Sequence, residues 1–453
     1  MAAALGGVPL FALIAGAALA GLALAGIDPA VAALEFNRLG SLPTLTALPL
    51  FAFAGLVLAE SRAPRRFLLL ARALFGRRPG GMAVAVVVVS AGFTAFTGAS
   101  GVTIIALGGL LLPAMLAAAR VQGRRHPERH AIGLIAAGGV PGLLLPPSLA
   151  VIVYAITAEV SVDRLFQATA VPGLLLVASL TLYATIARRR SAAGSAAAGA
   201  ARAAPAGPTG AAARSPGAGA GRAALGSRAA VRRAARAVRL CGWELPLPAA
   251  VVGGIYLGAI TVTEAATLTA AYVLAVEVLI RREIDLRRDL PGIVRNTGAL
   301  VGAILLVVGA ALALTNVLVD AQAPQRLLAA VTAHIEHPLL FLLALNGVLL
   351  VAGMLVDIFS AIVVLVPLIV PVAAALNIDP LHLGVVFLVN LEVGYLTPPV
   401  GINLFVARFR FARPLTAIYR AALPFALVLI AALLLITYLP PLSLFLPRLL
   451  GSH

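Results

Sequence analysis

The sequence is poor in the residues on which soluble proteins depend. Only 11% of its 453 residues are charged, whereas about a quarter are charged in a typical soluble protein. It contains no lysine and a single cysteine, Cys241. The scarcity of charge excludes a water-soluble enzyme. The single thiol excludes an internal disulfide framework and argues against a cysteine-based zinc site.

Motifs of nucleotide-driven and hydrolytic proteins are also missing. The sequence has no Walker sequence, no Ser/His/Asp constellation and no HExxH motif, which argues against ATP-driven transport and hydrolysis. An intramembrane enzyme acting on lipid-linked substrates is an alternative. It would need several acids and histidines converging near one interface, and the sequence offers few.

Long apolar runs dominate what is present. Hydrophobic residues make up 61% of the chain, and one helical membrane span takes about 20 of them. We therefore expect an all-α polytopic membrane protein. The first run, near 8–27, lacks a positively charged region before it, so we interpret it as a retained span and not as a signal peptide. The further runs lie near 44–60, 81–119, 131–158, 170–187, 245–280, 296–319, 338–376, 383–407 and 416–446.

The formal net charge of +17 is concentrated in one segment. Residues 188–239 hold 11 of the 34 arginines and no acid, in a background of Ala, Gly and Pro. Such a composition cannot bury a core and is typical of a flexible linker. Because it lacks interleaved aromatic residues, we expect no nucleic-acid partner. The segment divides the chain into an N-terminal membrane half, 1–187, and a C-terminal membrane half, 240–453.

The arginines also predict the orientation in the membrane. If the runs 81–119 and 338–376 each enter and leave by the same face, 30 of the 34 arginines fall on one side. The positive-inside rule makes that side cytoplasmic, which puts the N-terminus in the cytoplasm and the C-terminus in the periplasm. Whether each run is a re-entrant hairpin or a pair of full spans stays open, because both return to the same face.

Each of these two runs precedes an apolar segment that a proline pair interrupts. The broken segments lie at about 131–158 and 383–407. The same order of elements in opposite orientations predicts an inverted repeat. Secondary transporters with this arrangement bind substrate and ions near the membrane midplane, at broken helices.

Candidate ligands in the first half gather at the two interruptions. Small and hydroxyl residues in FTGASGVT allow an extended turn at membrane depth, with oxygens suited to a hard cation such as Na⁺. Close helix packing through small residues is the alternative. In GLLLPPS, the prolines lack N–H donors and break the helix, although a simple proline kink is equally consistent. The candidates are Thr97, Gly98, Ser100, Thr103, Pro146, Pro147 and Ser148.

In the second half, two acids lie in strongly apolar surroundings. Asp357 and Glu392 must each be paired, protonated or bound to a cation, because an unpaired charge there costs several kcal/mol. Capping of a half-helix N-terminus is an equally good role for such an acid. A third acid, Glu264 in TVTEAA, fits a helix-start signal. The candidate ion and substrate ligands here are Gly353, Asp357, Asn390, Gly394, Thr397, Pro398 and Pro399, and Asn403 adds a further neutral oxygen.

Taken in order, these motifs resemble the large membrane subunit of tripartite ATP-independent periplasmic (TRAP) transporters, the DctM-like permeases. The resemblance covers about Leu42 to Phe405, apart from the Arg-rich linker. It rests on ALPLFAFAGLVL, PGGMA, GASGVTIIALGGLLLPAM, GLLLPPS, TEAA, NIDPLHLG and NLEVGYLTPPVGINLFVA.

The resemblance implies a fold and an activity. The fold is two inverted repeats, each with a re-entrant hairpin and a Pro-broken helix, as in elevator proteins of the ion-transporter superfamily. The activity is Na⁺-gradient-driven uptake of a small organic anion, a carboxylate, across the bacterial inner membrane, with Na⁺ as coupling ion and no other cofactor. The implied partners are the lipid bilayer, a small four-helix membrane subunit and a periplasmic substrate-binding protein. The implied Na⁺ ligands are Thr97, Ser100, Thr103, Gly353 and Thr397.

Two departures from the family pattern stand out. The first tip commonly reads SGSSVAT, whereas this chain has TGASGVT and so lacks hydroxyls at Ala99 and Gly101. The usual TPTEAA is TVTEAA here, with Val262 in place of the proline.

Two other transport functions remain as alternatives. A self-sufficient carrier of the dicarboxylate or citrate type would need no binding protein, so that this chain alone would support uptake. A passive channel would conduct without Na⁺ dependence.

Overall fold

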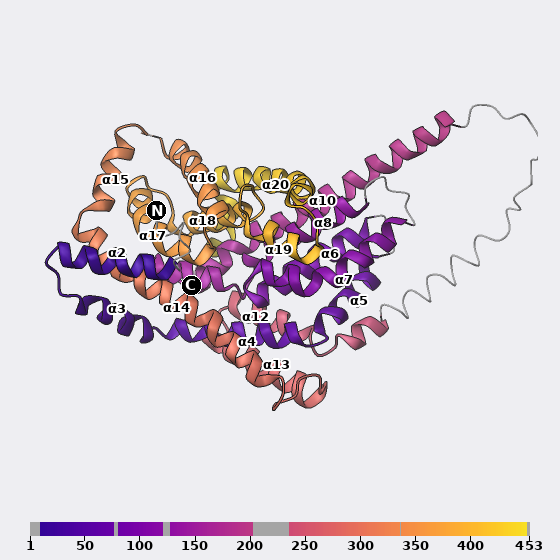
Figure 1. Cartoon of the computed structure of the whole chain (residues 1–453), viewed down its shortest axis with the longest axis horizontal. Coiled ribbons are helices and arrows are strands. Elements are labelled where there is room, and N and C mark those ends of the chain that lie inside the picture. Colours follow the sequence, from indigo (N-terminus) through magenta and orange to yellow (C-terminus); the bar gives the residue numbers. More distant parts are fainter. Residues whose placement is uncertain (1–9, 77–79, 121–126, 203–234, 336, 451–453) are drawn as a thin grey trace, which may run out of the picture.

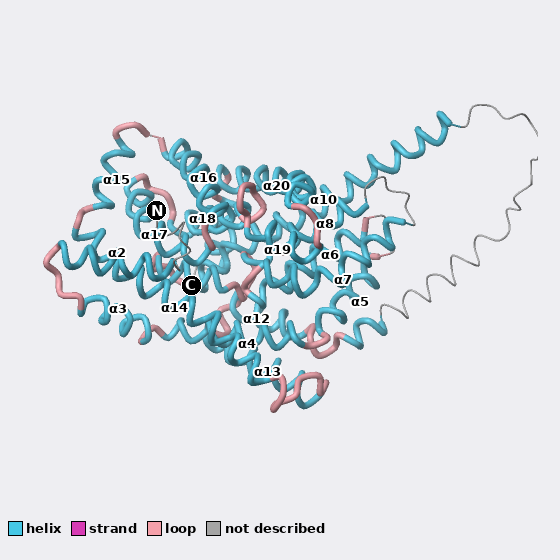
Figure 2. The backbone as a smooth tube through the Cα atoms, in the orientation of Figure 1, coloured by secondary structure: helices cyan, strands magenta, loops and turns pink. Residues whose placement is uncertain are grey.

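The chain folds into helices joined by short turns (Figure 2). The computed structural model describes residues 10–76, 80–120, 127–202, 235–335 and 337–450, and no strand occurs within these ranges. Helices satisfy their own backbone N–H and C=O groups, which a chain in lipid requires. Within the described ranges, eight helices are long and apolar enough to cross a membrane. The prediction of an all-α polytopic membrane protein is confirmed.

The helices of the N-terminal half follow the predicted runs closely. In chain order they are α2 (Leu10–Leu24), α3 (Ala30–Gly40), η1 (Pro43–Thr46), α4 (Ala47–Glu60), α5 (Ala63–Phe75), α6 (Gly81–Thr97), α7 (Ser100–Arg120), α8 (Pro127–Gly138), η2 (Val140–Leu143), α9 (Leu149–Thr157) and α10 (Val162–Arg202).

The C-terminal half repeats much of this order. Its helices are α12 (Pro246–Tyr256), α13 (Val262–Ala275), η3 (Val276–Ile280), α14 (Leu290–Asp320), α15 (Ala323–Thr332), α16 (Pro338–Leu355), α17 (Ile358–Ala375), α18 (Pro380–Gly394), α19 (Ile402–Phe411), α20 (Leu415–Tyr438) and α21 (Pro441–Leu450).

Both long runs form helical hairpins with tips inside the protein. In the first, α6 and α7 are separated only by Gly98 and Ala99, and Gly98 has a φ of +67°, a left-handed value that glycine adopts readily. The flanking Thr97 and Ser100 are buried. In the second, Val356 and Asp357 separate α16 from α17. The structure thus shows two helical hairpins, each with a two-residue turn, and their re-entrant placement in the membrane stays a prediction.

The segment after each hairpin is a broken helix. In the first half α8 ends at Gly138 and α9 begins at Leu149, with η2 between them. In the second half α18 ends at Gly394 and α19 begins at Ile402. Each gap contains one of the proline pairs, and both Pro–Pro peptide bonds are cis.

The two halves pack against each other in a reciprocal pattern. The second hairpin helix of each half contacts the far part of the other half's broken helix, so that α7 packs on α19 and α17 packs on α9. Likewise α8 packs on α20 and α18 on α10, while α4 packs on α13 and α14 on α2. Exchanging the halves therefore leaves this contact pattern unchanged, as expected for two structural repeats. The inverted orientation of the repeats in the membrane stays a prediction, and so do the domain boundaries.

Helix α10 differs from the expected linker boundary. The linker is predicted to begin at residue 188, but the helix continues to Arg202 and extends away from the body of the molecule (Figure 1). Alanine-rich sequence has high intrinsic helix propensity, and this overrides the lack of an apolar stripe. Residues 203–234 of the predicted linker lie outside the described residues, and the chain is helical again over 235–240.

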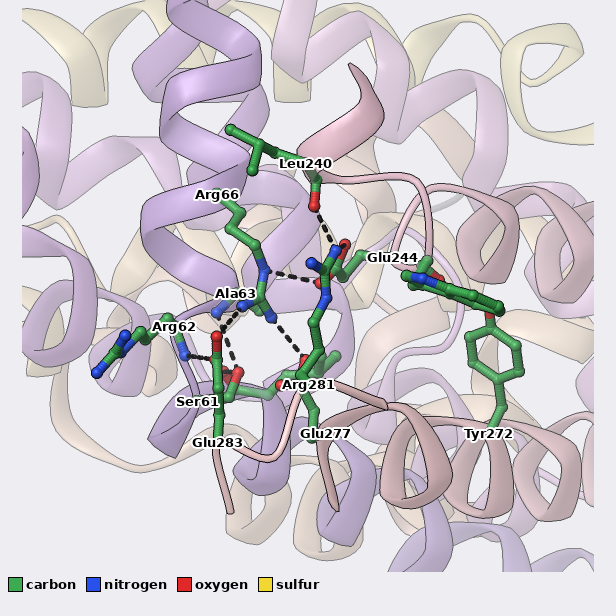
Figure 3. A network of polar contacts seen from close by, with 12 residues as sticks. Ser61, Arg62, Ala63, Arg66, Leu240, Glu244, Tyr272, Glu277, Arg281 and Glu283 are labelled. Carbon is green, nitrogen blue, oxygen red and sulfur yellow. Dashed lines mark hydrogen bonds and ion pairs between the residues drawn. The ribbon is translucent and has the colours of Figure 1, made fainter. Parts of the chain in front are cut away.

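A buried cluster of charges holds α5, the helix that leads into the first hairpin. The guanidinium of Arg66 forms ion pairs with Glu244 at 2.7 Å, Glu277 at 2.8 Å and Glu283 at 2.5 Å (Figure 3). Arg281 also pairs with Glu244, at 3.3 Å. Glu244 lies in the segment before α12, Glu277 on η3 and Glu283 in the turn after η3, so the cluster fixes α5 to the start of the second half.

Candidate functional site

The tip of the first hairpin is built from hydroxyl side chains. Thr94 and Thr103, which lie on α6 and α7, are joined by a hydrogen bond of 2.6 Å between their Oγ1 atoms. The hydroxyl of Thr97 donates a hydrogen bond to the carbonyl oxygen of Ala99 at 3.5 Å. All three threonines are buried. The tip therefore places hydroxyl and carbonyl oxygens together in the interior.

This tip lies against the break of its own half. A Cβ on Gly98 would lie 2.5 Å from Cδ1 of Leu149, the first residue of α9. Ser148, directly before it, caps α9 by accepting a hydrogen bond from the N–H of Val151 at 3.5 Å. Pro146 and Pro147 precede this cap. The seven candidates of the first half therefore lie on the tip and on the break that packs against it.

The same tip also contacts the broken helix of the other half. The hydroxyl of Ser100 donates a hydrogen bond to Oδ1 of Asn403 at 2.9 Å. Ser100 begins α7 and Asn403 is the second residue of α19, so two helix N-termini meet here. The Nδ2 of Asn403 is buried and has no hydrogen-bond partner among the described residues. Both the helix N-termini and this free N–H₂ group favour a negatively charged ligand.

In the second half, the backbone of the hairpin packs directly against the backbone of the break. A Cβ on Gly353 would lie 2.7 Å from the carbonyl oxygen of Leu391, and one on Gly394 would lie 2.7 Å from Cα of Gly353. The N–H of Gly401 donates to the carbonyl of Met354 at 3.0 Å. Only glycine permits such an approach, and this explains both glycines of the predicted site.

Asp357 serves as the helix cap that the sequence allowed. Its Oδ1 accepts a hydrogen bond from the N–H of Ser360 at 3.0 Å, and its Oδ2 accepts one from the Ser360 hydroxyl. Next to it, the N–H of Ile358 donates to the hydroxyl of Tyr395, which lies in the second break. Asp357 thus stabilises the N-terminus of α17. Its role as an ion ligand stays a prediction.

The remaining candidates of the second break differ in their placement. Thr397 donates its hydroxyl to the carbonyl of Val393 at 2.9 Å, within the break. Pro398 and Pro399 follow, and the carbonyl of Pro399 accepts a hydrogen bond from the hydroxyl of Tyr419 on α20. These three residues therefore lie in the same break as Gly394.

The amide nitrogen of Asn390 is hydrogen-bonded to other residues, whereas its Oδ1 is buried and has no hydrogen-bond partner among the described residues, so its role as a ligand stays a prediction. Its Nδ2 donates to Oδ1 of Asn346 on α16 at 2.6 Å, and Asn346 in turn donates to Thr437 on α20 at 3.1 Å. All three are buried. The amide of Asn390 thus belongs to a polar network that joins α16, α18 and α20, one helical turn before the break.

Glu392 is the most isolated acid in the described structure. Its side chain is fully buried, at 0% exposure, and neither carboxyl oxygen has a hydrogen-bond partner among the described residues. The sequence required this acid to be paired, protonated or bound to a cation. The described residues supply no partner, which leaves the neutral acid or a bound cation.

Several residues that complete the arrangement were not predicted from the sequence. Thr94 lies one helical turn before Thr97 in FTAFTGAS, and a search for hydroxyls on one helix face would have found it. The Tyr395 hydroxyl and the Asn346 amide each accept a hydrogen bond from a residue of another helix. Only the packing reveals them.

Comparison with known proteins agrees with this architecture. A family model described as "Tripartite ATP-independent periplasmic transporter, DctM component" matches residues 1–442. The chain belongs to this family. The C4-dicarboxylate TRAP transporter large permease protein DctM of Pseudomonas aeruginosa is 34% identical over 408 residues, which cover 90% of this chain and 87% of that protein. The isethionate TRAP transporter permease protein DctMQ of Oleidesulfovibrio alaskensis is 30% identical over 442 residues, which cover 97% of this chain and 64% of that protein.

A solved structure shares the fold at low sequence identity. The YdaH transporter of Alcanivorax borkumensis superposes with a TM-score of 0.55 and 17% identity, over 93% of this chain and 87% of that one. The DctM-family chain is therefore a large permease subunit of a TRAP transporter. It is a multi-pass membrane protein and not an enzyme.

Proposed function

We propose that this permease carries a small organic anion, a carboxylate, into the cell across the bacterial inner membrane, driven by a Na⁺ gradient. Its N-terminus lies in the cytoplasm and its C-terminus in the periplasm. It works with a small membrane subunit and with a periplasmic binding protein that delivers the substrate. The tripartite name of the family supports both partners.

The junction of Ser100 and Asn403 is the observation that best supports an anionic substrate. Two helix N-termini, each with unpaired backbone N–H groups and a partial positive charge, meet at this point. The buried Nδ2 of Asn403 adds a donor that lacks an acceptor among the described residues. An anionic group of the substrate supplies that acceptor. The names of the two relatives, for a C4-dicarboxylate and for isethionate, support a small organic anion.

The cation sites follow from the opposite helix ends. Helices α6, α16 and α18 end at the tips and breaks, where their last carbonyl groups lack intrahelical partners and carry partial negative charge. Hydroxyls of Thr97 and Thr397 lie beside these ends. Na⁺ prefers such neutral oxygen ligands, so we assign Thr97 to one site and Gly353 and Thr397 to the other. The resemblance to the family adds Ser100 and Thr103, across the hairpin turn, to the first site.

The motion we propose is of the elevator type. The hairpins and broken helices pack on one another, and α2, α4, α13 and α14 form a second group of mutually packed helices. The first group carries the substrate and the second acts as the scaffold. Na⁺ drives the motion only if it binds one state more tightly than the other, since equal affinity shifts no equilibrium.

Purification in mild detergent followed by reconstitution tests this proposal. The chain is isolated from its native membrane, and the polypeptides that accompany it are identified by mass spectrometry. The complex is then reconstituted into liposomes, and uptake of labelled malate or isethionate is measured with the binding protein outside. We expect a stoichiometric small membrane partner and uptake that requires an inward Na⁺ gradient.

Two results would contradict the proposal. Uptake by the chain alone, without a partner or binding protein, would establish a self-sufficient carrier. Flux that is independent of Na⁺ and dissipates with the substrate gradient would indicate a passive channel.

A further inference from the structure

A pocket of about 410 Å³ lies beside the first helix of the first hairpin. Its volume is in the range of small-molecule sites. One wall is a single face of α6, because its lining residues recur at helical spacing from Val88 to Phe96, over about 12 Å. The other walls come from α4, α5, α10, α12 and the first break. The long wall along α6 makes the pocket suitable for a chain-like ligand.

The walls of this pocket are almost free of polar groups. Among the described lining residues, only Tyr256 has a polar atom in its side chain. The rim is apolar as well, since Leu74, Val88 and Leu174 line the pocket and are 52%, 39% and 60% exposed. A carboxylate would find no partner on these walls, and burying an unpaired charge is costly. The pocket therefore fits a hydrocarbon chain and not the transported anion.

Helix α5, which forms one wall, has two contrasting faces. Its lining residues lie at positions 67, 70, 71, 74 and 75, whereas Arg62, Arg65 and Arg72 are exposed on the opposite side. A helix divided in this way lies at the boundary between lipid head groups and acyl chains. The arginines therefore mark the head-group level, and the pocket opens toward the acyl chains.

The exposed arginines of α5 are free to bind an anion. Their guanidinium groups form no ion pair within the part of the chain that the structure describes, because the three carboxylates nearby are paired with Arg66. The segment 235–240 adds the exposed Arg236 and Arg239, and it packs on α5 through Ala237 and Leu70. Arginines at this level attract anionic lipid head groups. This side of the membrane is the one that the positive-inside rule makes cytoplasmic.

We propose that this pocket binds an acyl chain of an anionic phospholipid from the cytoplasmic leaflet, with the head group on the exposed arginines of α5. The chain touches both helix groups of the permease, since Leu58 belongs to α4 whereas Phe93 and Pro146 belong to the first hairpin and its break. The lipid thus lies between the group that we assign to the scaffold and the group that we assign to transport. Its binding depends neither on the substrate nor on the coupling ion.

Photocrosslinking in native membranes identifies what occupies the pocket. The amino acid p-benzoylphenylalanine, which reacts with C–H bonds, replaces Leu174 at the rim or, as a control, Leu427 on α20. These two positions are 60% and 57% exposed. After irradiation the permease is purified with any partner, and the adducts are identified by mass spectrometry. We expect phospholipid adducts at both positions, with a ratio of anionic to zwitterionic lipid at least 5-fold higher at Leu174, because an arginine near the surface contributes about 1 kcal/mol.

One pair of variants tests the pocket itself. Gly92→Leu places a side chain in the pocket, and a Cβ there meets nothing within 4 Å, so the fold accommodates it. We expect this change to lower the ratio at Leu174 to that at Leu427. Gly347→Leu is the matched control, because its Cβ also meets nothing within 4 Å but lies on α16, outside the pocket. It is expected to leave the ratio unchanged.

A second pair tests the head-group contact. Arg72→Gln is expected to lower the ratio about 5-fold, since it removes about 1 kcal/mol of attraction to an anionic lipid. Arg295→Gln removes an exposed arginine of α14 that does not line the pocket, and it is expected to have no effect.

Three results would overturn the inference. A crosslink from Leu174 to a polypeptide would show that protein and not lipid covers the pocket. An equal ratio at Leu174 and Leu427, or a ratio that Gly92→Leu leaves unchanged, would show that no specific lipid binds. An Arg72→Gln protein with the wild-type ratio would overturn the head-group contact. Because the adducts are read without measuring uptake, the outcome is independent of the proposed function.

Discussion

The hydroxyl of Ser100 and the amide of Asn403 are hydrogen-bonded at 2.9 Å across 303 positions of sequence. Ser100 belongs to the hairpin of the first half and Asn403 to the broken helix of the second. The link is fully buried, so its net contribution of about 1 kcal/mol is not weakened by water. The proposed substrate site therefore belongs to neither half alone.

The Ser100–Asn403 link can be tested by a double-mutant cycle on Na⁺-dependent uptake. We expect Ser100→Ala and Asn403→Ala each to reduce uptake at least several-fold, and the double variant to lose less than the product of the two, because contacting residues are not additive. Ser90→Ala is the matched control. It removes a buried hydroxyl of the same hairpin that has no hydrogen-bond partner in the described structure. Wild-type uptake in the Ser100→Ala protein would show that the substrate does not bind at this junction.

Gly353→Ala is expected to abolish transport by separating the second hairpin from its break. The new Cβ would lie 2.7 Å from the carbonyl oxygen of Leu391, and backbone cannot move aside cheaply. Gly347→Ala, earlier on α16, is the control because a Cβ there meets nothing within 4 Å. That change should leave uptake intact and stabilise the helix by about 0.5–1 kcal/mol. Uptake and thermal unfolding in detergent provide the readouts, and equal behaviour of the two variants would refute the close approach.

Arg66→Gln is expected to destabilise the permease by about 3–5 kcal/mol. The change leaves three carboxylates, two of them buried, without the guanidinium that pairs them. Arg65→Gln, at the exposed neighbouring position of α5, should cost less than about 0.5 kcal/mol. The apparent melting temperatures in detergent compare the two. A stable Arg66→Gln protein would show that α5 is held mainly by apolar packing.

The reactivity of Cys241, the single thiol, tests the packing around the charge cluster of Arg66. Burial, together with the nearby carboxylate of Glu244, raises the pKa of Cys241 to about 11. Because the thiolate is the reactive form, its fraction at pH 8 is about 100-fold lower than for a thiol of pKa 9.0, and it rises tenfold per pH unit until about pH 11. We expect little reaction with maleimide at pH 8 in the native protein. Unfolding in denaturant should restore an ordinary rate, and fast labelling of the native protein would contradict the buried position.

Glu392→Gln should leave folding intact, in contrast to Arg66→Gln. The carboxyl group of Glu392 has no hydrogen-bond partner among the described residues, so the isosteric amide breaks no contact with them and removes the cost of a buried charge. We expect an unchanged or higher melting temperature in Na⁺-free detergent. A large fall would reveal a partner of the carboxylate. If added Na⁺ stabilises the native protein but not this variant, the cation binds at Glu392.

The sequence predicted the elements of the fold better than their contacts. Apolar runs and proline pairs located the hairpins and breaks because helix length and the missing proline N–H act locally. The helix-start signal around Glu264 is also local, and the expected cap is present as a capping box with Thr261. Helix α10 continues past residue 188, where the linker is predicted to begin, because the alanines up to Arg202 favour helix one residue at a time, whereas composition describes the linker as a whole.

The candidate site was less predictable than the fold. Asn390 lies about one helical turn before the break, and the hydrogen bond of its amide nitrogen to Asn346 on α16 could not be predicted from the sequence around it. The pairing of Ser100 with Asn403 depends on how two helices from opposite halves pack, which no local pattern encodes. The charge cluster around Arg66 likewise joins residues more than 200 positions apart, as the Arg66–Glu277 separation of 211 shows.

Reciprocal packing also sets a condition on biosynthesis. The ribosome makes Ser100 303 residues before Asn403, and at about 5–20 residues per second the delay is roughly 15–60 s. During this interval the first hairpin is in the membrane while the surface that later contacts α19 is still uncovered. Over the same time the hydroxyl of Ser100 lacks the acceptor that Asn403 later supplies. The contact between α7 and α19 therefore forms only after nearly the whole chain has been made.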